Sequence, residues 1–209
     1  MKKQIALLMA VIAIISVFAG CGKKTAEQDA TTQNTTNTTA TTTEQTEQQP
    51  DTTAPESAVK LLESVWALYG DDEKFFVVGG DENNAVSDAP GVYDVANTES
   101  LMFGLLVPEG NVGAIKEAAN LVHAMNSNVF SAAAFRLTDD ADVKTFADGM
   151  RDAIQYNQWM CGFPEKLLIA TVGDKFVVTA YGQEPMGTFE AKLKEAYPAA
   201  EILYNEVVN

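Results

Sequence analysis

The first 55 residues limit the folded part of this chain to residues 56–209. Lys2 and Lys3 precede a largely apolar run over residues 5–18. This run is shorter than the roughly 20 apolar residues that cross a bilayer, and it is typical of the central region of a signal peptide. Ala19, Gly20 and Cys21 follow as in a lipobox, with Phe18 at the position where Leu is usual. The pattern predicts a lipoprotein signal peptide over residues 1–20 and a diacylglycerol on Cys21. An uncleaved anchor with an incidental cysteine is the alternative.

Residues 21–55 consist mainly of Thr, Gln, Asn and Ala, with almost no large apolar side chain. Such a composition cannot offset the entropy lost on ordering. We predict a disordered spacer that holds the domain on the order of 30 Å from the lipid. The membrane partner would then be reached through the diacylglycerol on Cys21, and the protein is expected on the extracytoplasmic face of the cell membrane.

The charge of the chain restricts its partners. The whole chain has a formal charge of -15, and residues 56–209 carry -14, from 10 basic and 24 acidic side chains. An acidic domain repels phosphate backbones and anionic lipid, so nucleic acid is not expected as a partner. Cations and basic partners remain open. Of the two cysteines, only Cys161 lies in the domain, so no internal disulfide is expected.

The first half of the domain contains two apolar patterns with helical spacing. One begins at Pro55-Glu56-Ser57 and ends at Gly70, and a second begins beyond Pro108. Residues 79–97 are rich in Gly, Asp, Asn and Pro, which predicts a long loop. Residues 101–107 fit either a helix or a strand. The apolar positions of the two patterns are Ala58, Leu61, Leu62, Val65, Trp66 and Tyr69, and then Val112, Ile115, Ala119, Val122 and Met125.

The second half predicts a regular succession of elements. A strand over residues 130–137 precedes a helix capped by Thr138-Asp139-Asp140, whose inner face includes Phe146 and Met150. A hairpin follows, with strands at 167–172 and 176–181 around Gly173-Asp174. A helix stopped by Pro198 and a strand over 202–208 complete the order β-α-β-β-α-β. We therefore predict an α+β fold, with N-terminal helices followed by a ferredoxin-like sandwich that has helices on one face of an antiparallel sheet.

His123 and Cys161 are the candidates for catalysis. His123 is the only histidine and falls at the border of the second predicted helix. Cys161 lies in an apolar loop, and a nucleophilic thiolate would need a neighbouring base such as His123. The simpler expectation is a boundary histidine and a half-buried cysteine that packs as a small hydrophobic residue.

Acidic residues supply two further candidates. Asp139, Asp140 and Asp142 are favoured by the dipole of the helix that follows them, so they do not indicate a cation site. Asp81, Asn83 and Asp88 in the long loop are a slightly better candidate for Ca²⁺, although a solvated loop is the preferred explanation. Gly79-Gly80 lacks the strand, spacing and helix of a phosphate-binding loop. No metal or cofactor site is predicted.

The order of these segments, and the residues that separate them, resemble those of a known protein family. They are the spacer and first helix, Thr98-Glu99-Ser100-Leu101-Met102 before Pro108-Glu109, the strand before Arg136-Leu137, the helix ending near Trp159, and the hairpin about Gly173-Asp174. Together these are similar to small lipoproteins of Gram-positive bacteria that are defined only as a domain of unknown function. The resemblance spans most of residues 56–197. It implies the outer leaflet of a Gram-positive membrane, favours a helix over 101–106, and transfers no functional residue.

Two functions follow as hypotheses. The first is a non-enzymatic binding or accessory module of the cell envelope, whose partner is an envelope protein or a small-molecule ligand. The alternative is an envelope enzyme that uses Cys161 and His123. A two-lobed solute-binding protein is disfavoured because residues 56–209 are too few for two lobes and a hinge.

Overall fold

The computed structural model describes residues 54–125 and 129–209. The predicted signal peptide, Cys21 and the spacer through residue 53 lie outside the described residues, so these remain predictions. Within the described part of the chain, no helix combines the length and the apolar character needed to cross a membrane.

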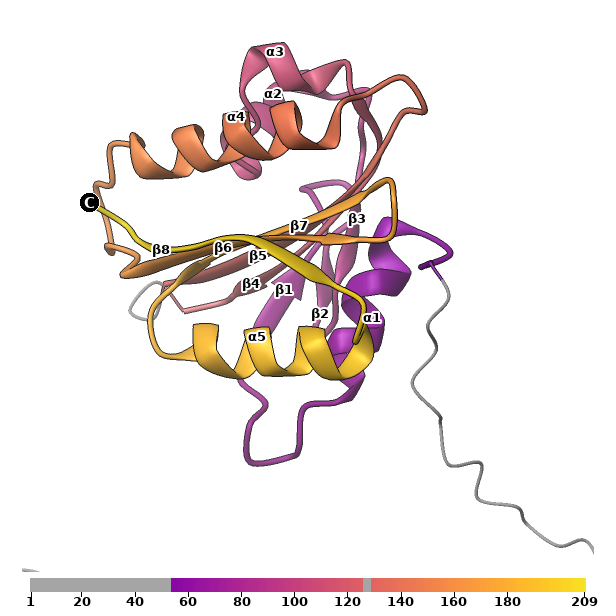
Figure 1. Ribbon diagram of the computed structural model, residues 1–209. Helices are drawn as coiled ribbons and strands as arrows, with labels where there is room; N and C mark the ends of the chain where they lie inside the picture. The colour runs from indigo at the N-terminus through magenta and orange to yellow at the C-terminus, as the bar shows by residue number, and fades with distance from the viewer. Residues whose placement is uncertain (1–53, 126–128) are drawn as a thin grey trace, which may run out of the picture. The chain divides into compact units, whose positions relative to one another are not determined.

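The described chain forms five helices and eight strands (Figure 1). The helices are α1 (Ala58–Ala67), α2 (Thr98–Gly104), α3 (Glu109–Val112), α4 (Val143–Gln155) and α5 (Pro185–Ala196). The strands are β1 (Val77–Gly79), β2 (Val86–Ser87), β3 (Gly91–Tyr93), β4 (Ile115–His123), β5 (Phe130–Leu137), β6 (Lys166–Val172), β7 (Phe176–Gly182) and β8 (Glu201–Val207).

All strands of the described residues belong to one sheet, in the order β2-β1-β4-β5-β7-β6-β8. Strand β3 lies beside β1 on the same edge of β4, where β3 pairs with residues 118–120 and β1 with residues 122–123. Every pairing is antiparallel. The α+β class predicted from the sequence is therefore confirmed.

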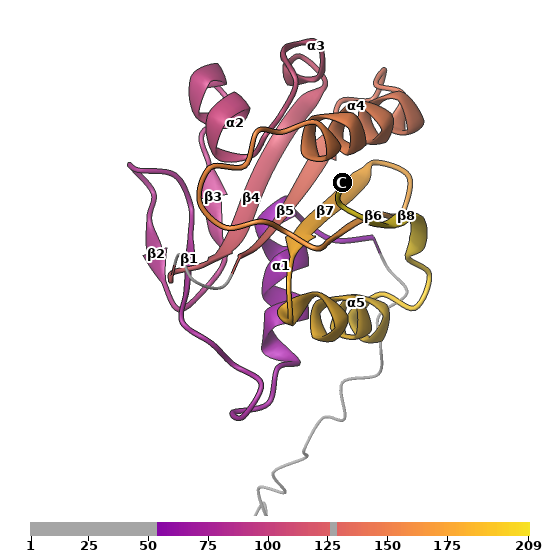
Figure 2. The same ribbon diagram turned by 90° about the vertical axis from the view of Figure 1, so that its left-hand side faces the viewer.

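Helices cover both faces of the sheet (Figures 1 and 2). Helices α1 and α5 enclose one apolar core, which contains Trp66, Phe130 and Phe189. Helices α2 and α4 enclose a second core on the opposite face, which contains Phe135, Phe146 and Leu167. The central strands are consequently buried on both sides, and the sheet has no solvent-facing side along β5, β6 and β7.

Helix α1 confirms the first predicted helix. Its N-cap is Ser57, whose hydroxyl accepts a hydrogen bond from the Lys60 N–H at 3.2 Å. Five apolar side chains of α1 are buried, and each Leu or Val among them contributes about 1.5–3 kcal/mol relative to an exposed one. The buried residues are Ala58, Leu61, Leu62, Val65 and Trp66, as the spacing predicts.

The second helix predicted beyond Pro108 is wrong. Only α3, a single turn, is helical there, and the rest of the segment is β4. Residues 118–121 of β4 are all buried, because α1 covers one face of the strand and α2 lies over the other. A strand buried on both faces loses the alternation of apolar and polar residues. The remaining apolar positions, such as Ile115, Ala119 and Val122, then match helical spacing by coincidence.

The predicted ferredoxin-like arrangement is also corrected. The elements from β5 to β8 do follow the order β-α-β-β-α-β along the chain. In a ferredoxin-like sheet the fourth strand of this unit returns to pair with the first, whereas β8 pairs with β6. The corresponding edge of β5 is occupied by β4. The strand order therefore differs from the predicted one.

The handedness of crossovers explains why the helices lie on opposite faces. Helix α4 joins β5 to β6 across β7, and α5 joins β7 to β8 across β6. Both connections step across the sheet in the same direction, but they start from strands that run in opposite directions. Two crossovers of the same right-handed kind must then pass on opposite faces. Figure 1 shows α4 on one side of the sheet and α5 on the other.

Residues 101–107, for which helix and strand were both open, and the predicted loop over residues 79–97 contain regular structure. Residues 101–104 belong to α2, and the helix ends at Leu105, so the helical interpretation is correct for this part of residues 101–107. The predicted loop over residues 79–97 contains β2 and β3. Here the backbones of β1 and β3 approach so closely that a Cβ on Gly79 would lie 2.1 Å from the nitrogen of Gly91.

Candidate functional site

His123 and Cys161 do not form a catalytic pair among the described residues. His123 lies on β4, where its ring stacks on Phe75 at 4.9 Å and its Nδ1 accepts a hydrogen bond from the Met125 N–H at 3.0 Å. Cys161 is exposed in the connection between α4 and β6, so the prediction of a half-buried cysteine is wrong. Within the described residues no hydrogen bond joins the two side chains. Among the described residues, no hydrogen bond brings a general base to the thiol.

Asp81 in the former loop is a structural carboxylate. It is only 5% exposed. Its Oδ1 accepts hydrogen bonds from the Asn83 and Asn84 N–H groups, both at 3.0 Å, and from the Asn84 side chain at 2.9 Å. Its Oδ2 accepts from the Asp94 N–H at 2.6 Å. Burial alone would raise the pKa of Asp81, but these hydrogen bonds together hold it below its ordinary value.

The calcium candidate is not assembled. Asp88 contributes its backbone to the fold, because its N–H donates to the Val77 carbonyl at 2.9 Å and its own carbonyl accepts from Trp66 Nε1 at 3.1 Å. The lone pairs of Asp81 face N–H groups, and a cation would have to displace them. In the ranges that the structure describes, no group of three or more His, Cys, Asp or Glu side chains is arranged to hold a metal ion.

The acids before α4 act on that helix, as the sequence predicts. The N-cap, however, is Asp142 and not the Thr138-Asp139-Asp140 segment. The Asp142 carboxylate accepts a hydrogen bond from the Thr145 N–H at 2.7 Å. Hydrogen bonds from the Thr145 side chain and backbone lower the pKa of Asp142.

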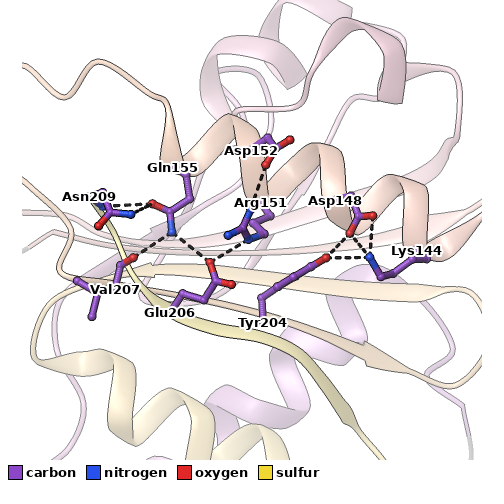
Figure 3. A network of polar contacts seen from close by, with 9 residues as sticks. All are labelled: Lys144, Asp148, Arg151, Asp152, Gln155, Tyr204, Glu206, Val207 and Asn209. Carbon is purple, nitrogen blue, oxygen red and sulfur yellow. Dashed lines mark hydrogen bonds and ion pairs between the residues drawn. The ribbon is translucent and has the colours of Figure 1, made fainter.

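A network of polar side chains joins α4 to β8 (Figure 3). At one end, Tyr204 lies between two cations, with its ring centroid 5.4 Å from the Lys144 Nζ and 5.3 Å from the Arg151 Cζ. The Tyr204 hydroxyl donates to Asp148 and accepts from Lys144, which also pairs with Asp148 at 2.5 Å. The Lys144 ammonium lowers the pKa of the Asp148 carboxyl.

The other end of the network holds the C-terminal residues (Figure 3). Arg151 Nε pairs with Glu206 at 2.8 Å. Gln155 Nε2 donates to the Val207 carbonyl at 2.9 Å, and Gln155 Oε1 accepts from the Asn209 N–H at 3.2 Å. Because the members satisfy one another, no strong nucleophile or base is left free. The network is best explained as the attachment of β8 to α4, to which exposed ion pairs contribute little individually.

Exposed apolar side chains gather on the connection between α4 and β6, which we call the aromatic loop (residues 156–163). Tyr156 is 81% exposed, Met160 89% and Phe163 64%. The apolar sequence around Cys161 predicts a segment that packs inward, whereas three of its side chains face outward. Its apolar composition between a helix and a strand was visible, but the direction of each side chain was not.

The aromatic loop is held in place from beneath. Trp159 points inward and packs on Tyr181, with 5.1 Å between ring centroids. Gly162 adopts a positive φ of 78°, which reverses the backbone at low steric cost. The Phe163 carbonyl accepts from Gln183 Nε2 at 3.0 Å. The exposed side chains are therefore presented by an anchored backbone, which reduces the ordering cost of binding.

No family model, curated protein or solved structure matches this chain. Function is therefore inferred from the charge, exposure and geometry described above.

Proposed function

We propose that this chain is a lipid-anchored, extracytoplasmic binding module that docks a partner protein of the cell envelope through the aromatic loop. The observation that carries the proposal is the outward exposure of Tyr156, Met160 and Phe163 on an anchored backbone. Aromatic and Met side chains are enriched where proteins bind one another. The lipobox at Cys21 and the resemblance to small Gram-positive lipoproteins support the proposed location on the extracytoplasmic face of the membrane.

The charge of the domain indicates the kind of partner. Glu165 follows the loop after Pro164, and Glu184 is next to Gln183, which holds the loop backbone. Both side chains are exposed, in a domain whose formal charge is -14. A partner with apolar side chains and a basic rim is complementary to this surface, whereas an anionic lipid surface is repelled.

Site-specific photo-cross-linking in cells tests the docking surface. A photoreactive residue at Met160 is expected to yield a protein adduct. The matched control position is Asp174, in the turn at the opposite end of β6. Tyr156→Asp combined with Phe163→Asp should lower the yield at Met160 about tenfold or more, as expected for loss of hot-spot side chains. Equal adducts at both positions, or a yield that resists the double substitution, would contradict the proposal.

The anchor has its own test. Cys21→Ala should leave an unprocessed precursor without lipid label, because no other residue at the predicted cleavage point can take the diacylglycerol. Cys161→Ser is the control and should keep normal labelling and processing. Lipid labelling that survives Cys21→Ala would remove the anchor from the proposal.

A further inference from the structure

A hollow lies between α2 and β3, at the edge of the sheet away from β8. Its volume is about 490 Å³, and we call it the α2 cavity. Figure 2 shows α2 beside β3. The cavity is lined by Glu82, Tyr93, Asn97, Glu99, Ser100 and Phe103.

The two carboxylates of the α2 cavity have no cationic partner. Glu82 and Glu99 are both exposed, and no described residue forms an ion pair with either of them. Other glutamates of the domain do pair: Glu117 with Arg136 at 2.9 Å and Glu190 with Lys194 at 2.6 Å. The α2 cavity thus has two carboxylates without a cationic side chain, of which Glu99 is also favoured by the dipole of α2.

The hydroxyl of Tyr93 provides an independent observation. The Tyr93 side chain is only 8% exposed, yet its hydroxyl end reaches the cavity wall, where a Cβ on Gly104 would lie 2.5 Å from the oxygen. None of the described residues hydrogen-bonds to this hydroxyl. Burial, and then the nearby Asp81 carboxylate, raise the pKa of Tyr93, so the group stays neutral. The ring of Tyr93 is buried while its hydroxyl oxygen is open to the cavity, so this oxygen can meet a ligand atom.

An apolar surface completes the α2 cavity. Phe103 is 76% exposed although it belongs to a helix with a buried face. The face of an exposed aromatic ring attracts ammonium and guanidinium groups. Carboxylates, a hydroxyl oxygen and an aromatic ring are together the groups that bind an organic cation.

We infer that the α2 cavity binds an organic cation with N–H donors, either the ammonium or guanidinium group of a basic side chain or a small free amine. The ammonium donates to the carboxylates of Glu82 and Glu99 and to the Tyr93 hydroxyl oxygen, while its carbon chain lies on Phe103. The negative charge of the domain concentrates such cations at its surface. The α2 cavity does not share residues with the aromatic loop, so this inference goes beyond the proposed docking function.

Calorimetric titration of the detergent-solubilised full chain tests the inference. The probe is Nα-acetyl-lysine methylamide, which has one ammonium group, and the control probe is its Nε-acetylated form, which has none. The first should bind and the second should not. Glu99→Gln and Glu82→Gln should each weaken binding about tenfold, the effect of losing one charge-assisted hydrogen bond. Tyr93→Phe should weaken it less, because a neutral hydrogen bond is lost.

Glu109→Gln is the matched variant. Like Glu99, Glu109 is an exposed acid in the first turn of its helix, but it does not line the α2 cavity. It changes the net charge equally and should leave the dissociation constant unchanged. Equal weakening by Glu109→Gln, or binding of the acetylated probe, would overturn the inference, as would absence of binding by the lysine probe.

A Lys-containing hexapeptide and 1,5-diaminopentane separate the two sources of the cation. Tighter binding of the peptide assigns the cavity to a basic protein segment, and tighter binding of the diamine assigns it to a free amine. Cross-linking at Met160 should be unaffected by Glu99→Gln, so failure of this inference and failure of the docking proposal are distinguishable.

Discussion

Asp81 is a buried carboxylate whose hydrogen bonds all come from the segment that it organises. Three of the donors belong to Asn83 and Asn84, and the fourth is the N–H of Asp94 just beyond β3. Asp81 thus ties the β1–β2 turn to the end of β3. In the sequence Asp81 and Asn83 resemble calcium ligands, whereas in the fold the Asp81 carboxylate accepts three backbone N–H groups and one side-chain amide.

Asp81→Asn should lower the free energy of unfolding by about 2–3 kcal/mol, because hydrogen bonds to a charged acceptor are lost and N–H donors stay buried. Urea denaturation measures this change. Asp88→Asn is the control, since Asp88 is exposed, and it should change stability by less than about 0.5 kcal/mol.

The same comparison has a defined pH dependence. The folded pKa of Asp81 lies below its ordinary value. A lowered carboxyl pKa contributes stability that is complete above the unfolded pKa of about 3.9 and is lost as pH falls through the folded pKa. The gap between the wild type and Asp81→Asn should therefore be constant near neutrality and shrink below about pH 4. A gap that persists at the lowest pH would show that the charge is not responsible.

Cys161 tests the enzymatic alternative at the same scale. Because Cys161 is exposed and His123 is engaged with Phe75 and Met125, iodoacetamide should alkylate the thiol at the same rate in the wild type and in His123→Ala. Mass spectrometry over time gives both rates. Slower alkylation in His123→Ala would place the two side chains together and restore the alternative.

Elements with one apolar face could be predicted from the sequence, and so could β5, β6 and β7, whose short apolar runs are bounded by polar or turn residues. Strand β4, whose buried part has apolar residues on both faces, could not. In α5, Phe189 and Leu193 are fully buried and polar residues lie between them, so the helical spacing of apolar residues could be recognised in the sequence. In β4, Ala118 and Ala119 are buried on opposite faces, and no period of two remains. The strand order was hidden for another reason, because it depends on β4 occupying the edge of β5. The α2 cavity joins Glu82 to Glu99 only through that tertiary arrangement.

The close approach of the β1 and β3 backbones requires glycine at residue 79. Gly79→Ala should cost at least about 2 kcal/mol, because its methyl group would overlap the backbone at Gly91, which cannot move like a side chain. Gly110→Ala is the matched control, with no atom within 4 Å of the added carbon. It should change stability by less than about 0.5 kcal/mol, and thermal unfolding compares the two.

At the scale of the whole molecule, the predicted spacer and the folded domain should be energetically independent. Deleting residues 25–53 should leave the free energy of unfolding of the solubilised protein unchanged within about 0.5 kcal/mol, because a Thr- and Gln-rich segment contributes no apolar core. Leu62→Ala, in the α1 core, shows the sensitivity of the assay and should cost about 2–5 kcal/mol. A loss above about 1 kcal/mol on deletion would mean that the spacer packs against the domain.

The placement of the two ends of β6 has a mechanical consequence. Ala54, where the described chain begins, lies beside Gly173 in the turn after β6, and the aromatic loop enters β6 at its other end. In the proposed function, the lipid and a docked partner would pull near opposite ends of β6, which is about 23 Å long. The pull on the membrane side would enter the domain through α1, which follows Ala54 and packs on β4 and β5. Hydrogen bonds of an antiparallel sheet lie across the strands, so a force directed along the strands would load these bonds in shear.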